Sequence, residues 1–494
     1  MTAAAALAAG RAAQRLARVP SAPLARRAPV PNGATSAPAD TSSSAPADRL
    51  CRLIADKAVD TVLVCMCDMQ GRLAGKRMTA RHFRETRHED VHACDYLLGV
   101  DIDMQPIEGL AASSWELGFG DFAIRPDFST MRLPPWLPGT ALVLGDTVDK
   151  QGHLVPHAPR SMLKRQLGRL AEAGYAAMMA SELEFYVFEG DWKEARRRDY
   201  RGLAPDGFYS EDYQVFQTSA KERLMRSVRN GMEAAGIPIE CSKGESGPGQ
   251  TEINLLYAPA LEMADRHVIY KNGVKELAQA EGQSATFMAK WHDQLPGSSC
   301  HIHSSIWQAG LAATASSDPG RPHGMSAVFE HWLAGQIALA RELTLFLAPC
   351  LNSYKRFQAG SFAPTRTVWS LDNRTAAFRV MGGGASQRVE CRVPGADVNP
   401  YLADAALVAA GLHGIRHSLP LSPPLEGNAY LAQGGPQIPT TLREATEALD
   451  GSAVLREAFG DDVVDHYVRA AQWEQAEADR RVTDWEVARY FERV

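Results

Sequence analysis

Two acidic segments contain the residues of this chain that are most able to do chemistry. The segment Ser181–Phe188 alternates carboxylates with apolar residues, so in an extended strand Glu182 and Glu184 lie on the same face. The second segment, Gly249–Asn254, contains Glu252. Neighbouring carboxylates repel each other, so a buried pair requires a metal ion or an arginine nearby. Alternating charge is also typical of the solvated face of an antiparallel sheet, and the first segment alone leaves that interpretation open.

Two later segments repeat the alternation with other polar side chains. A lone histidine beside an apolar run is usually a satisfied core residue, but two histidines at strand spacing indicate the lining of a cavity. The residues that share a face are His301, His303 and Ser305 in one segment and Arg388, Glu390 and Arg392 in the other.

A set of candidate metal ligands can be assembled from these segments and one loop. Glu245 lies in the glycine-rich stretch 243–249, where it is either a ligand or an exposed turn residue. An oxygen-rich set with a single imidazole favours Mg²⁺ or Mn²⁺ over zinc. The candidate ligands are Glu182, Glu184, Glu245, Glu252, Glu390 and His301.

Several arginines follow in the region 352–392. The planar guanidinium pairs with phosphate and carboxylate through two hydrogen bonds, so a group of arginines indicates a clamp for an anionic substrate and a transferring phosphoryl group. Any one of them alone could form a surface ion pair. These arginines are Arg356, Arg374, Arg379, Arg388 and Arg392.

In order, spacing and residue type, these motifs resemble the glutamine synthetase family over the region from about Thr61 to Leu421. The resemblance implies an α+β fold. An N-terminal β-grasp-like domain would precede a larger catalytic domain, whose curved antiparallel sheet forms a funnel. ATP would enter the funnel at one end and glutamate at the other.

The resemblance also implies roles for the candidate residues. Two or more Mg²⁺ or Mn²⁺ ions would be held, the first by Glu184, Glu245 and Glu252 and the second by Glu182, His301 and Glu390. The ATP contacts would be His303, Ser305, Arg379 and Arg388. The glutamate contacts would be Gly297, Arg356 and Arg392, with Arg356 and Arg374 catalytic and Arg374 stabilising the phosphoryl group in transfer.

The implied reaction has two steps. Because a carboxylate is a poor electrophile, ATP first phosphorylates the γ-carboxylate of glutamate, while metal ions and arginines neutralise the crowded oxygens. An amine then displaces phosphate and leaves an amide. Positioning of the reactants supplies much of the acceleration.

The segment Phe357–Pro364 departs from the family pattern. Where ammonia-using members have a glutamate in this flap, the chain has Phe362, preceded by Ser361, and Pro296 replaces an asparagine common near the glutamate site. An aromatic wall suits the carbon skeleton of an alkyl amine better than a small hydrated cation. The variant resembles γ-glutamylpolyamine and γ-glutamylethanolamide synthetases, which use organic primary amines. If Phe362 only packs the flap, the chain is an ammonia-dependent glutamine synthetase.

A third alternative is a catalytically inactive member with a structural or regulatory role. Loss of catalysis normally erodes metal ligands and arginines first, and here all of these positions are filled by matching residue types, which argues against it.

The chain divides into three predicted regions. Residues 1–48 are rich in Ala, Pro, Ser and Arg and are predicted to be disordered or a removable leader. Residues 49–150 form the β-grasp-like domain, beginning with a hairpin whose turn is at Gln70-Gly71, and residues 151–494 form the catalytic domain. Helical periodicity predicts helices over 160–173, 260–281 and 332–346 and in the charged tail after Pro424.

Composition agrees with a globular enzyme. The 494 residues are 45% hydrophobic and 22% charged, and the net charge of -6 argues against nucleic acid as a partner. Eight cysteines without a Cys-x-x-Cys pair suit a reducing compartment, and no apolar run is long enough to span a bilayer, so we expect a cytoplasmic protein without membrane association. If residues 1–48 are a transit peptide, the compartment would be an organelle. The family resemblance further implies a homo-oligomeric double ring, a dodecamer, with active sites between subunits.

Overall fold

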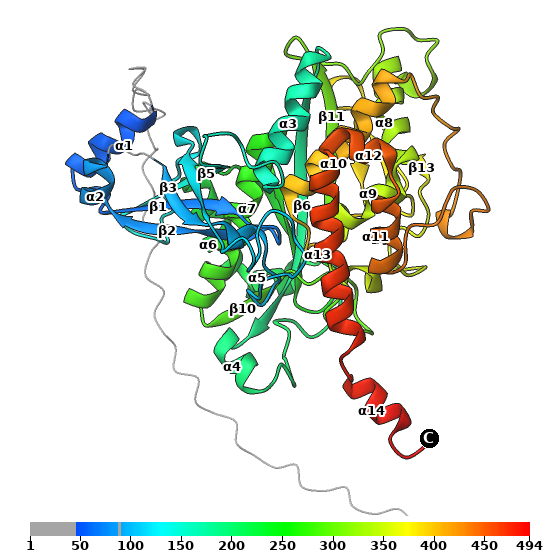
Figure 1. The fold of residues 1–494 in the computed structure, drawn as a ribbon. Helices are drawn as coiled ribbons and strands as arrows, with labels where there is room; N and C mark the ends of the chain where they lie inside the picture. The colour runs from blue at the N-terminus through cyan, green and yellow to red at the C-terminus, as the bar shows by residue number, and fades with distance from the viewer. Residues whose placement is uncertain (1–45, 87–89) are drawn as a thin grey trace, which may run out of the picture. The chain divides into compact units, whose positions relative to one another are not determined.

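A small mixed sheet is formed by the first part of the chain. The computed structural model describes residues 46–86 and 90–494, and this sheet has the strand order β2-β1-β5-β4-β3 (Figure 1). β1 runs parallel to β5, and the other neighbouring strands are antiparallel. The strands are β1 (Thr61–Cys67), β2 (Leu73–Thr79), β3 (Val91–Cys94), β4 (Asp121–Pro126) and β5 (Thr140–Val148).

A larger sheet follows, with the main strand order β13-β14-β15-β11-β6-β8-β7. The long strand β6 also pairs with β9 and β10, and β12 pairs with β11. β13 and β14 are parallel, whereas the other pairs are antiparallel. The strands are β6 (Ala176–Glu189), β7 (Ile239–Gly244), β8 (Gln250–Leu255), β9 (Ala258–Pro259), β10 (Gln283–Thr286), β11 (Cys300–Gln308), β12 (Leu311–Ala312), β13 (Trp369–Leu371), β14 (Phe378–Met381) and β15 (Arg388–Cys391).

Helices cover the large sheet. Leu183, Phe185 and Val187 of β6 are fully buried, and helices α3 and α7 pack against this strand. The first helices are α1 (Pro46–Ala55), α2 (Ala80–Glu85), α3 (Pro159–Glu172), α4 (Trp192–Arg197), α5 (Val215–Ala220), α6 (Glu222–Ala234) and α7 (Ala260–Ala280). The later ones are α8 (Ala327–Ala338), α9 (Ala340–Leu347), α10 (Pro400–Arg416), α11 (Leu442–Asp450), α12 (Ala453–Phe459), α13 (Asp461–Asp479) and α14 (Asp484–Tyr490).

Helix α10 lies in the centre of the helical layer and has a well-defined start. The side-chain oxygen of Asn399 accepts a hydrogen bond from the Tyr401 N–H at 3.1 Å, and Pro400 occupies the first turn, where its missing N–H costs nothing. Nearly all of its residues are buried, as expected for a helix that is apolar on every side. Of the helices in the described residues, none is both long and apolar enough to cross a membrane.

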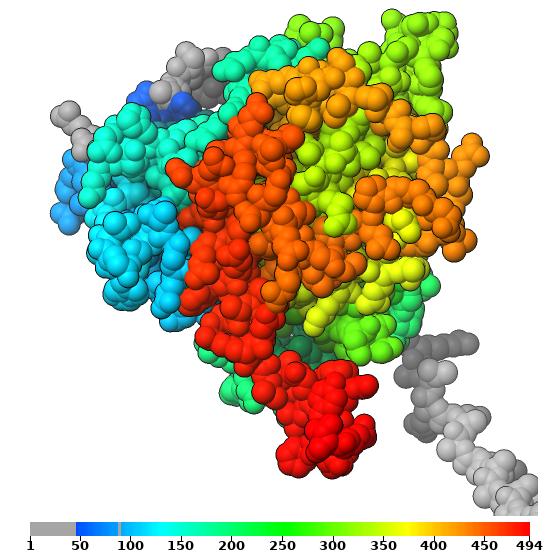
Figure 2. Space-filling view, turned by 45° about the vertical axis from the view of Figure 1, so that its right-hand side comes forward, coloured from blue at the N-terminus to red at the C-terminus, as the bar shows by residue number. Residues whose placement is uncertain are grey.

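The C-terminal helix α13 connects the two sheets. His466 Nε2 lies 2.8 Å from the Leu98 carbonyl, Arg469 Nε donates to the Glu108 carbonyl at 2.6 Å, and Trp473 Nε1 donates to Asp101 at 3.2 Å. Figure 2 shows this helix in red against the blue and cyan N-terminal residues. Helix α13 is therefore bound to the segment that follows β3, while it also packs against α11 and α12.

Most of the predicted elements are confirmed. The fold class, a small N-terminal sheet followed by a larger α and β region, is that of the structure. The predicted hairpin is β1 and β2, with Gly71 at φ 79° in its turn, and the first two predicted helices are α3 and α7. Residues 46–48 already belong to α1, and the prediction for residues 1–45 lies outside the described residues. The division near residue 150 stays a prediction.

The single helix predicted over 332–346 is wrong, because the chain forms α8 and α9 with a break at Leu339. A Cβ on Gly335 would lie 2.1 Å from the Ala410 carbonyl oxygen, so α8 and α10 are in close backbone contact. Helix α9 instead packs against α11. Both helices contact α10, but only α9 also has α11 as a main neighbour.

Candidate active site

Three carboxylates converge at one end of β6. The antiparallel register sets Glu184 of β6 opposite Glu252 of β8, and Glu245 comes from the turn between β7 and β8. One oxygen from each lies within 4.8 Å of the others. Glu184 and Glu252 are buried, so this is not the solvated sheet face that the alternation alone left open.

Burial and mutual repulsion make these carboxylates hard to ionise together. Burial, with the nearby charge of Glu245, raises the pKa of Glu184 to about 7, although the Ser299 N–H and hydroxyl donate to it at 2.9 and 2.5 Å. Burial and the charge of Glu184 raise the pKa of Glu252 to about 9. Lys243 pairs with Glu245, and despite burial Glu252 and Glu245 raise the pKa of its amine to about 12. This oxygen-rich group fits a hard divalent cation such as Mg²⁺ or Mn²⁺.

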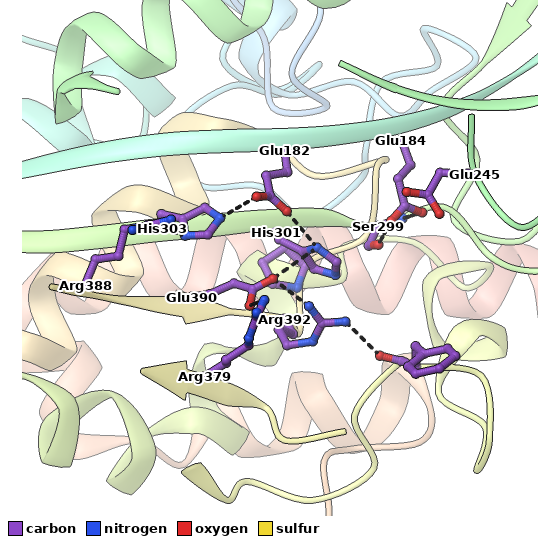
Figure 3. A network of polar contacts seen from close by, with 12 residues as sticks. Glu182, Glu184, Glu245, Ser299, His301, His303, Arg379, Arg388, Glu390 and Arg392 are labelled. Atoms are coloured by element: carbon purple, nitrogen blue, oxygen red, sulfur yellow. Dashed lines mark hydrogen bonds and ion pairs between the residues drawn. The ribbon is translucent and has the colours of Figure 1, made fainter. Parts of the chain in front are cut away.

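A second group forms farther along β6 (Figure 3). The register sets Glu182 opposite His301 of β11, and His303 opposite Glu390 of β15. The Nδ1 atom of His301 lies 3.3 Å from an oxygen of Glu182 and 3.3 Å from an oxygen of Glu390. His303 Nε2 lies 2.8 Å from Glu182. The three residues predicted to bind the second metal are therefore in contact with one another.

The protonation of this second group follows from its neighbours. Burial, with Arg392 nearby, lowers the pKa of His301 to about 4, so the ring is neutral at pH 7 and can act as a ligand. Burial opposes ionisation of Glu182, but hydrogen bonds from His301 and His303 outweigh it and hold the pKa of that carboxyl well below its usual range. Arg388 Nε donates to His303 Nδ1 at 3.2 Å, which assigns the ring proton to Nε2, facing Glu182.

Two arginines bind Glu390 of β15 and add to this group. Arg392 donates to one oxygen of Glu390 at 2.5 Å and Arg379 donates to the other at 3.1 Å. Burial opposes ionisation of Glu390, but His301 and Arg392 lower its pKa. Arg379 also pairs with Asp372 through its Nε at 3.0 Å. The guanidinium groups are therefore held in place by carboxylates that do not move with the substrate.

Arg356, at the end of the short 3-10 helix Ser353–Arg356, faces Gly297. Its Nη2 donates to the carbonyls of Arg392 and Pro394 at 3.3 and 3.0 Å, whereas its buried Nε has no hydrogen-bond partner among the described residues. The buried Nε of Arg392 likewise has none among them. A Cβ on Gly297 would lie 2.7 Å from Arg356 Cγ, so only glycine leaves this approach open. Two unused guanidinium donors, one of them on the arginine beside Gly297, fit the carboxylate of a small substrate.

The flap residues Ser361 and Phe362 lie beside these arginines. Arg392 Nη2 donates to the Phe362 carbonyl at 3.4 Å, and the Ser361 hydroxyl donates to the Gln358 carbonyl at 2.6 Å. Phe362 has φ 59°, a left-handed conformation that is an outlier for a bulky side chain, and its side chain is 62% exposed. Backbone strain of this kind is concentrated at binding sites and costs about 1–3 kcal/mol. The exposed ring is therefore held at the site by its backbone and does not fill the core.

A cavity of about 680 Å³ lies at the arginine-rich end. Its lining includes Arg374, Arg379 and His323. Arg374 is exposed there, and Ser305 accepts a hydrogen bond from Trp307 Nε1 at 3.0 Å. Within the described residues, no hydrogen bond or ion pair joins Arg374 or Ser305 to the carboxylate groups. The structure thus brings Arg374 into the lining of this cavity, whereas it does not bring Ser305 into the lining.

Sequence reasoning did not assign three residues that hold the carboxylates. Ser299 donates to both oxygens of Glu184, the Gln250 amide donates to the same carboxylate at 3.1 Å, and Lys243 pairs with Glu245. Gln250 shares the period of two with Glu252, and this signal could have indicated it. Ser299 and Lys243 carry no comparable pattern.

Comparisons with known proteins agree with this geometry. The family model described as glutamine synthetase, catalytic domain, matches residues 156–490. The chain is 49% identical to the gamma-glutamylethanolamide synthetase GlnA4 of Streptomyces coelicolor, over 92% of this chain and 98% of the relative. It is 36% identical to a glutamate–isopropylamine ligase of a Pseudomonas species, over 88% and 95% of the two chains. A solved structure described as apo GmaS without ligand superposes with a TM-score of 0.78 at 26% identity, covering 89% of this chain and 98% of that one.

The chain therefore belongs to the glutamine synthetase family. It is an enzyme of the ligase class, and its family uses ATP and divalent metal ions. The family resemblance and the enzyme class expected from the motifs are confirmed.

Proposed function

We propose that the chain is an ATP-dependent ligase that joins the γ-carboxylate of glutamate to a small organic primary amine, with ethanolamine as the favoured acceptor. The observation that carries the choice of acceptor is Phe362, exposed and strained, at the flap position where ammonia-using relatives carry an acid. The 49% identity to a gamma-glutamylethanolamide synthetase and the 36% identity to a glutamate–isopropylamine ligase support the same choice.

In this proposal the two carboxylate groups hold the metal ions. Glu184, Glu245 and Glu252 hold the first, and Glu182, His301 and Glu390 the second. Bound divalent ions would neutralise charge on the nucleotide phosphates and on the phosphoryl group in transfer. Three converging acids at the first group and a neutral histidine at the second are the donor types that such ions accept.

The arginines bind the two substrates. Arg356, which lies beside Gly297, and Arg392 have unused buried donors and bind the carboxylates of glutamate. Arg379 and Arg388, with His303 and Ser305, bind the nucleotide. Arg374, free of ion pairs with the carboxylate groups, turns toward the phosphoryl group and stabilises its equatorial oxygens. Because Arg379 is fixed by Asp372 and Glu390, its position costs little reorganisation during the reaction.

The acceptor enters next to the flap. The ring of Phe362 offers an apolar and π surface to the carbon skeleton and amine of the acceptor, where a carboxylate would favour ammonium. The neutral amine then attacks the carbonyl carbon of the γ-glutamyl phosphate, the bond from that carbon to the phosphate oxygen breaks, and the departing phosphate takes up the proton that the amine loses.

A phosphate-release assay with ATP, Mg²⁺ and glutamate tests the proposal. Ethanolamine, isopropylamine, putrescine, spermine and ammonium are compared by kcat/KM. Ethanolamine should exceed ammonium by about tenfold or more, a difference of about 1.4 kcal/mol in transition-state binding. Ammonium as the best acceptor would make the chain a glutamine synthetase, and a polyamine as the best acceptor would overturn the choice of ethanolamine. No turnover with any acceptor would favour the inactive alternative.

The variant Phe362→Glu tests the flap directly. It should lower the ratio of kcat/KM for ethanolamine to that for ammonium, because the new carboxylate attracts the small cation. Leu311→Glu, which makes the same kind of change at a residue 74% exposed on β12, should leave the ratio unchanged. An acceptor profile that is equal in the wild type and Phe362→Glu would remove the flap from acceptor selection.

The proposal includes a cytoplasmic homo-oligomer, a double ring with active sites between subunits. Light scattering of the purified chain tests the assembly, and a monomer with full activity would contradict active sites shared between subunits.

A further inference from the structure

A second large cavity lies on the other side of β6 from the carboxylates. Its volume is about 820 Å³, within the range of small-molecule sites. Phe287 lines it and packs against Phe185 of β6 with ring centroids 5.2 Å apart, and Phe185 faces away from Glu184 by the strand alternation. The turn between β1 and β2, helix α7, the segment after β10, the end of α9 and helix α13 enclose this cavity, here called the α7 cavity.

The walls of the α7 cavity are mostly apolar. The cavity opens to solvent, since Ile102 and Met288 in its lining are exposed. Apolar walls with a few charged groups are typical of small-molecule sites. The apolar lining includes Val268, Phe287, Leu345, Phe346, Leu402 and Ala471.

One cation in this lining has no anionic partner. The amine of Lys275 forms no hydrogen bond or ion pair with the described residues, and its Nζ lies 5.8 Å from the centre of the Phe287 ring. Burial, with the charges of Lys271 and Arg72, lowers the pKa of this amine to about 8. Lys271 instead donates to the carbonyls of residues 396 and 398 at 2.7 and 3.3 Å, and Arg72 pairs with Asp68 at 2.7 Å.

The acids that line the α7 cavity do not neutralise Lys275. Asp101 accepts a hydrogen bond from Trp473 Nε1 at 3.2 Å, and Asp397 accepts one from the Ser353 hydroxyl at 2.6 Å. Glu474 also lines the cavity, and burial and the charge of Asp101 raise the pKa of its carboxyl. None of the three forms an ion pair with Lys275 in the described part of the chain.

We propose that the α7 cavity binds an amphipathic organic anion, whose apolar body fills the cavity and whose carboxylate pairs with the amine of Lys275. A desolvated ammonium without a counter-ion gains most from such a partner, while the apolar walls supply affinity at about 25 cal/mol for each Å² of apolar surface buried. A neutral apolar molecule would leave the amine unpaired.

The α7 cavity also touches the segment that ends in Arg356. Asn352, in the lining, accepts a hydrogen bond from the Lys290 N–H at 2.8 Å and donates to its carbonyl at 2.7 Å. The next residue, Ser353, bonds to Asp397, also in the lining. An anion bound here therefore contacts the outer side of the loop that carries the proposed glutamate contact Arg356. We expect it to change the KM for glutamate more than kcat.

Calorimetric titration of the full chain, without substrates, tests the binding. Octanoate should bind saturably, and octan-1-ol at least about tenfold more weakly, because it lacks the charge. Lys275→Met should weaken octanoate binding by about tenfold or more, and Lys275→Arg should retain it. Lys150→Met, which removes an exposed charge outside the lining, should bind octanoate like the wild type.

Two further variants separate the effect of charge in the lining from the effect of the volume of the α7 cavity. Ala471→Leu reduces the cavity and keeps Lys275, so it should weaken octanoate and octan-1-ol alike. Glu474→Gln removes an acid of the lining and should strengthen octanoate alone. No saturable binding to the wild type, equal affinity for octanoate and octan-1-ol, or unchanged binding to Lys275→Met would each overturn the proposal. The binding result does not depend on the reaction that the carboxylate cluster catalyses, so the two proposals fail separately.

Discussion

Two buried groups of acids in this protein differ in whether every acid is balanced by an ion pair with a cation. Around Arg160 of α3, the guanidinium pairs with Asp265 through two hydrogen bonds of 3.0 and 3.1 Å and with Asp127 at 2.8 Å. It also pairs with Asp146, and the Tyr401 hydroxyl donates to Asp265 at 2.6 Å. This Arg160 network joins the N-terminal sheet to α7 and α10.

The group of Glu184, Glu245 and Glu252 is not balanced in this way, because among the described residues only Glu245 forms an ion pair. Lys243 pairs with Glu245, but Glu184 and Glu252 face each other across the strand pair, and the pKa values of both are raised by burial and by nearby acids. A buried ion network with its hydrogen bonds satisfied holds a fold together, whereas a buried group with excess charge of one sign opposes folding and persists where it binds something. The difference separates a structural site from a functional one without reference to relatives.

The largest expected effect comes from removing one acid of the unbalanced group. Glu252→Ala should lower kcat/KM in the phosphate-release assay by about 10³-fold, because a metal ligand is lost. In EDTA, its free energy of unfolding should equal or exceed that of the wild type, because a repulsion between buried carboxylates is also removed. Glu240→Ala, on the exposed part of β7, should keep full activity. Near-normal turnover by Glu252→Ala would refute the assignment of this residue as a ligand.

In the Arg160 network we expect the opposite result, a loss of stability with little change in activity. Arg160→Met leaves Asp265 buried without its cation and should lower the free energy of unfolding by about 3–5 kcal/mol, measured by urea denaturation. Activity per folded molecule should stay close to that of the wild type. Arg197→Met removes an exposed arginine of α4 that pairs with Glu194, and should cost no more than about 0.5 kcal/mol. If Arg160→Met loses no more stability than Arg197→Met, the Arg160 network is not structural.

A divalent metal ion should neutralise the excess negative charge of Glu184, Glu245 and Glu252. Mg²⁺ at about 100 times its dissociation constant should raise the free energy of unfolding of the wild type by about 2.7 kcal/mol, because it binds only the folded chain. Arg160→Met should show the same gain, because the substitution leaves Glu184, Glu245 and Glu252 unchanged. If Mg²⁺ raised the free energy of unfolding of Glu252→Ala as much as that of the wild type, the stabilising ion would bind at a site that does not include Glu252.

The sequence predicted the faces of the strands better than the way in which they pair. Alternation with period two is a local property, so the common face of Glu182 and Glu184 could be inferred from eight consecutive residues. That Glu184 lies opposite Glu252 depends on a register between strands far apart in the chain, and it was reached only through the family resemblance. Ser299, which holds Glu184, lies just before β11 and has no periodic signal of its own.

The break between α8 and α9 and the α7 cavity could not be predicted for a related reason. Leu339 lies inside a continuous apolar pattern, and the close approach of Gly335 to α10 depends on residues far away in the chain. The α7 cavity is lined by residues between positions 69 and 474, and its volume depends on how many separate segments of the chain pack together. Periodicity describes one element at a time and contains no information about the space between several of them.

The smallest expected effect concerns a pair of buried histidines, which are neutral and so differ from both charged groups. The rings of His157 and His466 lie 4.3 Å apart, and His466 Nε2 donates to the Leu98 carbonyl at 2.8 Å. Burial lowers the pKa of His157 to about 4, and burial with the nearby His157 lowers that of His466 to about 3. Both pKa values lie below the unfolded value of about 6.5, so the unfolded chain binds more protons than the folded chain. The free energy of unfolding therefore decreases as the pH is lowered from about 6.5 toward 4.

Between about pH 6.5 and pH 5, each histidine should remove up to about 2 kcal/mol from the free energy of unfolding, measured by urea denaturation at both pH values. His466→Gln keeps a donor for the Leu98 carbonyl and removes one titrating ring, so it should reduce the loss by about half. His92→Gln, at an exposed position of β3, should leave the loss unchanged. Equal losses in the wild type and His466→Gln would mean that the pH dependence arises from the acids of the two charged groups, and that a neutral buried pair adds nothing to it.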